Sequence, residues 1–196
     1  MSRNFNKDYF TMFNYVDYLD RYDRYEKLTV DIVDLLKKIG LQKKDSRILD
    51  YGCAVGFLVE ALTKLGYKNT YGYDISEWAI QKAKEKNLNI IDEVEKDFYD
   101  VIYCLDVVEH MYDDEIDNFL SKLDTKVMVV RIPVSTDGGE SFHLSVSRRD
   151  PTHINCKTKE QWKNLFKQYG FDNFLDISLS QIYNTTGVWC TLCLKN

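Results

Sequence analysis

The 196-residue sequence lacks the long apolar stretches that mark membrane proteins. No uninterrupted apolar run approaches the roughly 18 residues that a membrane-spanning helix requires. The first ten residues, MSRNFNKDYF, also lack the apolar central region of a secretory signal peptide. These two absences predict a cytoplasmic protein with no membrane partner.

An excess of basic charge is also absent. The chain holds 26 Lys and Arg residues against 31 Asp and Glu residues, which gives a formal net charge of -5. No stripe of Lys and Arg follows any of the expected helices. Because the average surface would repel a phosphate backbone, nucleic acid is not expected as a partner.

The cysteines do not form a recognisable disulfide or zinc framework. There are five: Cys53, Cys104, Cys156, Cys190 and Cys193. The odd count and the expected cytoplasm argue against disulfides. Cys190 and Cys193 form one Cys-x-x-Cys, but an odd separation on a strand points the two side chains to opposite faces. Because no second Cys or His pair completes four ligands, no metal site is predicted and both residues are expected in the core.

The chain also lacks internal repeats and low-complexity linkers, so residues 1–196 are expected to form a single domain. Short β-branched runs alternate with helical patterns, which is typical of a doubly wound, mostly parallel sheet covered on both faces. Strands are expected at 47–51, 70–75, 89–91, 100–106, 126–134, 171–178 and 188–194, and helices at 8–40, 55–65, 77–86, 113–123 and 159–169. The loop 181–187 is too short for a helical crossover, so the last strand should be antiparallel.

The amino-terminal part, residues 1–44, is expected to be a helical arm on the core formed by residues 45–196. Four tyrosines recur there at helical spacing: Tyr15, Tyr18, Tyr22 and Tyr25. The spacing stacks them on one face of a helix. They either cover the domain with buried rings and wet hydroxyls, or line a ligand cleft as a lid together with Arg21 and Arg24. Packing is favoured, because aromatic stripes are usually part of a core.

The most informative stretch is RILDYGCAVGFL, residues 47–58. It ends a strand in Asp50 and then places Gly52, Ala54 and Gly56 where a helix begins with unpaired N–H groups. Ligands of open α/β sheets bind beyond the carboxyl ends of the strands. A dinucleotide fold would show G-x-G-x-x-G around a pyrophosphate, which Asp50 would repel. The pattern therefore disfavours an NAD-dependent oxidoreductase and favours a cationic ligand.

Residues 48–56, ILDYGCAVG, resemble the first motif of the class I S-adenosylmethionine-dependent methyltransferases. YGYDIS, residues 71–76, is similar to the second motif of that family. Residues 98–111, FYDVIYCLDVVEHM, resemble the fourth-strand motif of its small-molecule branch, and residues 150–171 resemble the stretch that enters its last helix. The resemblance implies a Rossmann-like doubly wound sheet of seven strands, mostly parallel, with an antiparallel last strand.

The resemblance implies S-adenosylmethionine as cofactor and a set of residues that bind it. The set is Asp50, Gly52, Cys53, Ala54, Gly56, Asp74, Ile75, Asp92, Leu105 and Asp106. Asp74 would hold both ribose hydroxyls with Ile75 beside the adenine, and Asp50 would assist the ammonium group. Two departures from the family pattern stand out: Ala54 replaces the middle glycine, and residues 90–100 lack the usual Gly-Asp, for which Asp92 is the nearest substitute.

The acceptor is expected to enter near the polar segment 135–157. His153 lies in this segment, and imidazole suits proton removal from a hydroxyl because it titrates near neutral pH. The other interpretation of His153 is a loop residue that fixes RRDPTH by hydrogen bonds. Three arginines, Arg131, Arg148 and Arg149, could hold an anionic group of the acceptor. By resemblance, Glu109 and His110 shape the turn near the methionine part of the cofactor.

These observations predict an enzyme that transfers a methyl group to an oxygen or nitrogen of a small molecule. A sugar, a nucleotide-linked sugar or an aromatic metabolite would fit as acceptor. The alternative is a non-catalytic module that binds S-adenosylmethionine and serves as a sensor or partner subunit. Nothing in the sequence indicates an oligomeric state.

Overall fold

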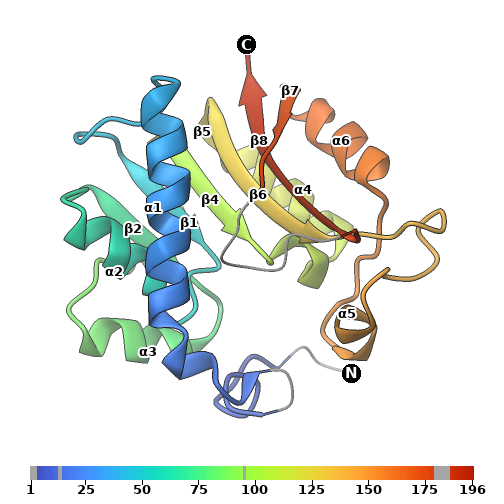
Figure 1. The fold of residues 1–196 in the computed structure, drawn as a ribbon, viewed down its shortest axis with the longest axis horizontal. Helices are drawn as coiled ribbons and strands as arrows, with labels where there is room; N and C mark the ends of the chain where they lie inside the picture. The colour runs from blue at the N-terminus through green and yellow to red at the C-terminus, as the bar shows by residue number, and fades with distance from the viewer. Residues whose placement is uncertain (1–3, 13–14, 95, 179–185) are drawn as a thin grey trace.

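The structure, a computed structural model, describes residues 4–12, 15–94, 96–178 and 186–196 (Figure 1). A six-stranded sheet runs through its centre in the order β2-β1-β4-β6-β8-β7. Its strands are β1 (Ile48–Tyr51), β2 (Thr70–Tyr73), β4 (Val101–Leu105), β6 (Val127–Pro133), β7 (Phe171–Asp176) and β8 (Val188–Lys195). The first four are parallel, and β8 pairs antiparallel with both β6 and β7. This confirms the Rossmann-like fold with its antiparallel edge.

The expected count of seven strands is corrected to six. The third expected strand, residues 89–91, makes only a single parallel bridge in which Ile90 faces Gly72. The apolar alternation of a strand does not continue beyond Ile91, because five of the next six residues in the sequence, 92–97, are charged. A small parallel pair that the sequence did not predict, β3 (Phe98–Tyr99) and β5 (Asp124–Thr125), lies outside the main sheet.

Helices cover both faces of the sheet. They are α1 (Tyr22–Lys38), α2 (Phe57–Lys64), α3 (Glu77–Glu85), α4 (Asp113–Lys122), α5 (Ser145–Arg149) and α6 (Lys159–Gln168). The short α5 was not expected. No helix among the described residues is long and apolar enough to cross a bilayer. Helix α1 crosses in front of the sheet in Figure 1.

Each face of the central strands packs into its own apolar core. Residues of α1 and α2 pack with Val101 and Tyr103 of β4, whereas α4 and α6 pack with Ile102 of the same strand. Alternate side chains of a strand point to opposite faces, so a strand buried on both faces reads as a continuous apolar run. Cys190 and Cys193 also divide between the two cores, as their spacing predicts.

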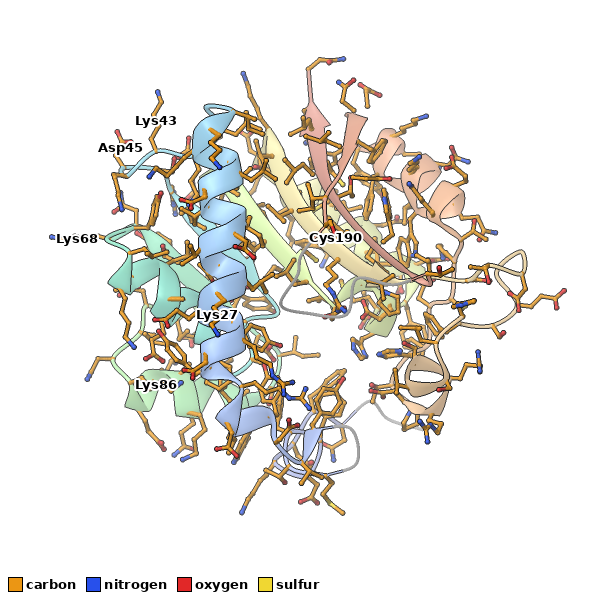
Figure 2. All side chains as sticks on the ribbon, in the orientation of Figure 1. Lys27, Lys43, Asp45, Lys68, Lys86 and Cys190 are labelled. Carbon is orange, nitrogen blue, oxygen red and sulfur yellow. The ribbon has the colours of Figure 1, made fainter. Side chains whose placement is uncertain are left out.

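In contrast to the two apolar cores, the surface carries charged side chains. Figure 2 shows Lys43 and Lys68 at the edge of the molecule, Lys27 on helix α1 and Cys190 over the sheet. The labelled charged residues are all exposed: Lys27, Lys43, Asp45, Lys68 and Lys86.

The amino-terminal arm differs from the single helix expected over residues 8–40. Only α1 is a regular helix, and the described residues before it form turns and a short 3-10 helix, η2 (Tyr18–Asp20); residues 13–14 lie outside the described part. A helix of 33 residues would extend roughly 50 Å, about twice the length of α1. The chain instead folds back, because Phe10 and Tyr18 are buried by stacking on Trp78 and Phe57.

Helix α3 begins at Glu77, as the sequence predicts, directly after its N-cap, Ser76. Its hydroxyl accepts a hydrogen bond from Ala79 N at 3.1 Å, which satisfies a donor of the first turn. We expect Ser76→Ala to lower the free energy of unfolding by about 1 kcal/mol, measured by urea denaturation. Ser121→Ala, at an exposed position in α4, is the matched control and should change it by less than about 0.5 kcal/mol. Equal effects of the two substitutions would contradict the capping role.

Candidate functional site

A cavity of about 720 Å³ opens at the carboxyl ends of β1, β2 and β4. The turn after β1 forms its floor with Asp50, Gly52 and Ala54. The amino-terminal arm, including Tyr15, and the segment around α5, including His153, contribute further walls. The cavity therefore lies where open α/β sheets bind their ligands.

The turn after β1 depends on glycine at two positions. Gly52 and Gly56 both have a φ of +80°, in the left-handed region. A Cβ atom on Gly52 would lie 2.4 Å from a methyl carbon of Val107, and one on Gly56 would lie 2.5 Å from a methyl carbon of Leu88. The two glycines thus allow the backbone of the turn to lie close to the residues at the ends of β4 and α3.

Ala54 occupies the same turn in a conformation that suits glycine. Its φ is +48°, and a non-glycine residue in this region costs roughly 1–2 kcal/mol. Its amide donates a hydrogen bond of 2.8 Å to Oδ2 of Asp74, which holds the turn against the end of β2. The replacement of the family's glycine by alanine therefore carries a backbone cost that side-chain size alone does not indicate.

Two carboxyl groups, the buried Asp50 and the half-buried Asp74, lie at the ends of β1 and β2. Asp50 is 4% exposed, and burial together with the charge of Asp74 raises its pKa to about 8. Burial also raises the pKa of Asp74, although the amides of Ser76 and Ala54 donate to it and favour the ionised form. In the described part of the chain, no basic side chain forms an ion pair with either. The pair therefore suits a cationic ligand with hydroxyl groups.

A third acid, Asp106, follows β4, and its negative charge is balanced by a basic residue. It has a φ of +58° and forms an ion pair with Arg131, a buried residue of β6. Arg131 lines the cavity, whereas Arg148 and Arg149 do not. Arg148 instead donates hydrogen bonds to the carbonyl groups of Phe142 and His143 within its own loop. Of the three arginines expected near an acceptor, the structure brings only Arg131 to the cavity.

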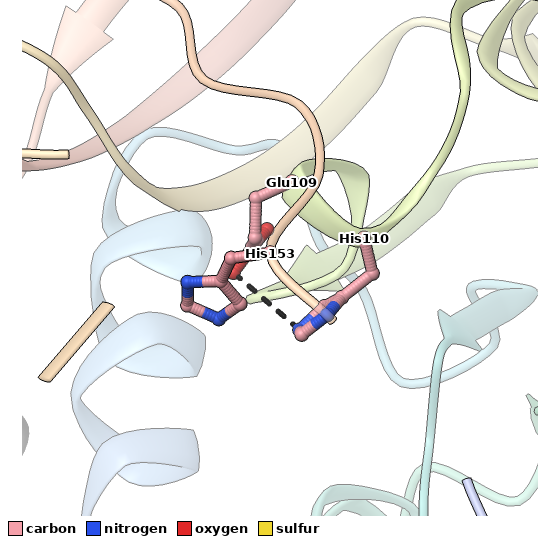
Figure 3. Close-up of side chains that lie close together, drawn as sticks. All are labelled: Glu109, His110 and His153. Carbon is pink, nitrogen blue, oxygen red and sulfur yellow. Dashed lines mark ion pairs between the residues drawn. The ribbon is translucent and has the colours of Figure 1, made fainter. Parts of the chain in front are cut away.

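A carboxylate and two histidines meet on another wall of the cavity: Glu109, His110 and His153 (Figure 3). Glu109 and His110 end the 3-10 helix η3 (Val108–His110), and Nε2 of His110 lies 4.0 Å from Oε1 of Glu109. The rings of His110 and His153 are 4.6 Å apart. Burial raises the pKa of Glu109 and lowers that of His153, which favours the neutral form of each.

Most of the residues expected to bind the cofactor line this one cavity. They are Asp50, Gly52, Cys53, Ala54, Asp74, Ile75, Leu105 and Asp106. Gly56 begins helix α2 behind the turn and does not line the cavity. Asp92 does not reach it either: its carboxylate is exposed and pairs with Lys84 at 2.8 Å.

The arm contributes more to the cavity than its tyrosine spacing indicates. Phe5 and Tyr9, which lie outside the spaced tyrosines, also line it. The hydroxyl of Tyr9 donates to that of Tyr15 at 3.1 Å, and Tyr15 in turn donates to Asp150 Oδ2 at 3.4 Å. The arm therefore both packs on the core and faces the cavity. Sequence periodicity missed these residues because they reach the cavity from turns rather than from a helix.

The fold and this site define a class of protein. A mostly parallel sheet with an antiparallel edge, a glycine turn after β1 and an acid at the end of β2 are those of the class I S-adenosylmethionine-dependent methyltransferases. The model of a family described as a methyltransferase domain matches residues 21–175, so the chain belongs to that family. The resemblance seen in the sequence is thereby confirmed.

Known proteins support the same assignment. The chain resembles the magnesium protoporphyrin IX methyltransferase of Synechocystis PCC 6803 with bound SAH, at 21% identity and a TM-score of 0.62, over 94% of this chain and 89% of that one. It resembles an S-adenosylmethionine-dependent methyltransferase of Clostridium acetobutylicum ATCC 824, at 17% identity and a TM-score of 0.65, over 93% and 99%. At these identities the likeness is one of fold.

A curated relative matches in sequence over a shorter stretch. It is the ribosomal protein L11 methyltransferase of Thermotoga neapolitana, which is 30% identical over 90 residues. The match covers 44% of this chain and 31% of that protein. The chain therefore spans only a part of this relative's length.

The buried Asp50 should make the ligand-free protein less stable as the pH rises. Its folded pKa of about 8 lies above the ordinary aspartate pKa of 3.8, so between these pH values the unfolded chain releases a proton that the folded chain keeps. We expect Asp50→Asn to raise the free energy of unfolding, by at least about 1 kcal/mol at pH 8 and by less at pH 5. Denaturant unfolding at both pH values measures this gain.

Asp92→Asn is the control, because Asp92 is an exposed acid of the same chain. Its effect should vary little between pH 5 and pH 8. If Asp50→Asn destabilised the protein equally at both values, the carboxyl group would not be protonated in the folded state.

Proposed function

We propose that this protein binds S-adenosylmethionine in the cavity and transfers its methyl group to an oxygen or nitrogen of a small molecule. The observation that carries the proposal is the pair of carboxyl groups, the buried Asp50 and the half-buried Asp74, beside a turn whose backbone has no side chain at Gly52. A ligand with an ammonium group, a positive sulfur and two ribose hydroxyls matches this arrangement in charge and in hydrogen-bonding groups.

Each part of the cofactor has a counterpart in the cavity. The carboxylate of Asp74 would accept hydrogen bonds from the ribose hydroxyls, and Ile75, which is 61% exposed, would be covered by the adenine. Asp50 would face the ammonium group directly or through water, with the carbonyl groups of Gly52 and Leu105 as further acceptors. Methyl transfer from a sulfonium is a single displacement, so holding the two reactants in line supplies much of the catalysis.

The size of the whole cavity, which would hold the cofactor and the acceptor together, favours a small acceptor. Small-molecule sites are typically about 300–1,000 Å³, and this cavity is within that range. Rings of Tyr9 and Tyr15 line it from the arm, which suits a sugar or an aromatic ring, and the arm would act as a lid. The named methyltransferases that the chain resembles act on acceptors as different as a porphyrin and a ribosomal protein, so the acceptor class rests on the cavity itself. The absence of nucleic acid as acceptor and a cytoplasmic location stay predictions of the sequence.

His153 is the residue we propose to act on the proton of a hydroxyl acceptor. Burial lowers its pKa, so the imidazole is neutral near pH 7 and able to accept a proton. Its Nδ1 atom is buried and has no hydrogen-bond partner in the described part of the chain. Asp150 lies 3.8 Å from Nε2, where it would stabilise the charged ring.

Binding of the cofactor should release a proton from Asp50. At pH 7 the buried carboxyl group holds a proton in the ligand-free protein, and a bound ammonium group would lower its pKa. We expect calorimetry in phosphate and in Tris to show a binding enthalpy that differs between the buffers by the release of up to one proton. Asp50→Asn should remove the difference and weaken binding at least about tenfold. Buffer-independent binding by the unsubstituted protein would contradict the role of Asp50.

Turnover separates the proposed enzyme from a non-catalytic module. With a panel of phenols, sugars and aromatic amines, we expect formation of S-adenosylhomocysteine to depend on the acceptor. For a hydroxyl acceptor, His153→Gln should lower kcat about 100-fold with little change in affinity for S-adenosylmethionine. Binding of the cofactor without turnover on any acceptor would favour the sensor or partner subunit, and absence of binding would remove both.

A further inference from the structure

The group of Glu109, His110 and His153 has a feature that methyl transfer alone does not require. One carboxylate oxygen and one nitrogen from each imidazole lie within 4.8 Å of one another, and the group faces the cavity (Figure 3). The residues come from two parts of the chain, η3 and the loop after α5, that the fold brings together. Sequence analysis, which predicted no metal site, missed the group because 42 residues separate His110 from His153.

Glu109 is a buried carboxyl group that accepts no hydrogen bond in the part of the chain that the structure describes. Its exposed fraction is 0%. Leaving a buried carboxyl group unsatisfied is costly, and native proteins usually pair it or place it on a metal. Asp106 and Asp150 add negative charge nearby, while Arg131 is already engaged by Asp106. The surroundings of Glu109 therefore favour a cation.

His110 is held as metal-binding histidines are held. Its Nδ1 atom lies 3.2 Å from the carbonyl oxygen of Thr152 and 2.9 Å from the Thr152 hydroxyl. A carbonyl oxygen only accepts, so Nδ1 carries the proton and the lone pair is on Nε2, the atom on the side of Glu109. The interaction of Nδ1 with Thr152 fixes both the tautomer and the direction of the His110 ring. Thr152 is itself fixed by hydrogen bonds to Asp150.

We propose that Glu109, His110 and His153 bind one divalent ion of a first-row transition metal, such as Mn²⁺, Fe²⁺, Co²⁺ or Zn²⁺, in the wall of the cavity. Two imidazoles and one carboxylate are ligands that these ions accept, and the cavity leaves further coordination positions to water or to oxygens of a second molecule. Ligand atoms about 2.1 Å from one ion lie about 3.4 Å apart at tetrahedral angles, so ligand atoms within 4.8 Å of one another need to converge by up to about 1.4 Å.

The inference deepens the proposed function and rests on it for the role of the ion. An ion at this place would bind oxygens of the acceptor and lower the pKa of an acceptor hydroxyl. In the metal-loaded protein His153 is then a ligand of the ion, and its effect on the acceptor proton is exerted through the ion. The acceptors most favoured would carry two adjacent oxygens, as in a catechol, a hydroxy acid or a sugar diol, because two oxygens can occupy two coordination positions.

Cobalt titration tests the site in the full chain without any acceptor. We expect CoCl₂ to bind at one ion per chain by calorimetry, with visible absorption bands typical of nitrogen and oxygen ligands. Glu109→Gln keeps the shape of the side chain and His153→Asn removes the imidazole. Each should weaken cobalt binding at least about tenfold. His143→Asn is the control, since His143 is exposed, bonds Thr136 and lies outside the group, and it should bind cobalt as the unsubstituted protein does.

The same samples are titrated with S-adenosylhomocysteine. Retained binding of this nucleoside by Glu109→Gln and His153→Asn would show that both variants fold and that only the ion site is lost. No cobalt binding, cobalt binding that both variants retain, or absorption from thiolate ligands would overturn the inference. Failure of the nucleoside to bind the unsubstituted protein would overturn the proposed function and leave the cobalt result standing.

Discussion

The rest of this structure depends on the electrostatics of two neighbouring acids. Asp50 is buried and Asp74 is half-buried at the ends of adjacent strands. Burial raises the pKa of both, and the charge of Asp74 raises that of Asp50 further. The fold accepts this because the backbone around them is fully organised: two amides hold Asp74, and Gly52 and Gly56 take left-handed conformations that bring the turn against its neighbours. A cation arriving in the cavity would relieve the strain between the two acids. The two acids therefore lower the stability of the ligand-free fold at the place where we propose that the ligand binds.

The cavity is organised as two regions that differ in their polar groups. At the ends of β1 and β2 stand carboxyl groups with backbone carbonyls, suited to a nucleoside with an ammonium group. Beyond β4 stand imidazoles with Glu109, suited to the proton or the metal ligands of a second molecule. Arg131 lies in the cavity wall and offsets Asp106, so that the negative charge is not uniform. The arm closes over both regions with aromatic rings, which ties acceptor entry to packing of the amino-terminal segment.

Local signals predicted most of the fold and the residues that line the cavity after β1 and β2. Strand and helix patterns and the glycine turn are short-range features, and from them Asp50 and Asp74 were expected at the strand ends, where both residues line the cavity. The prediction of one continuous helix for the arm was wrong, because burial of Phe10 and Tyr18 against distant helices outweighs the local spacing of aromatic residues. Asp92 forms an ion pair with Lys84 and does not line the cavity. The proximity of Glu109 and His153 depends on the geometry of the loops, which residue spacing in the sequence does not predict.

A crystal structure with bound S-adenosylhomocysteine tests the central claim most directly. The account predicts density for the nucleoside over the turn at Gly52, with its ribose hydroxyls within hydrogen-bond distance of Asp74 and its ammonium group on the side of Asp50. The adenine should cover Ile75. A nucleoside bound elsewhere, or a ribose turned away from Asp74, would contradict it.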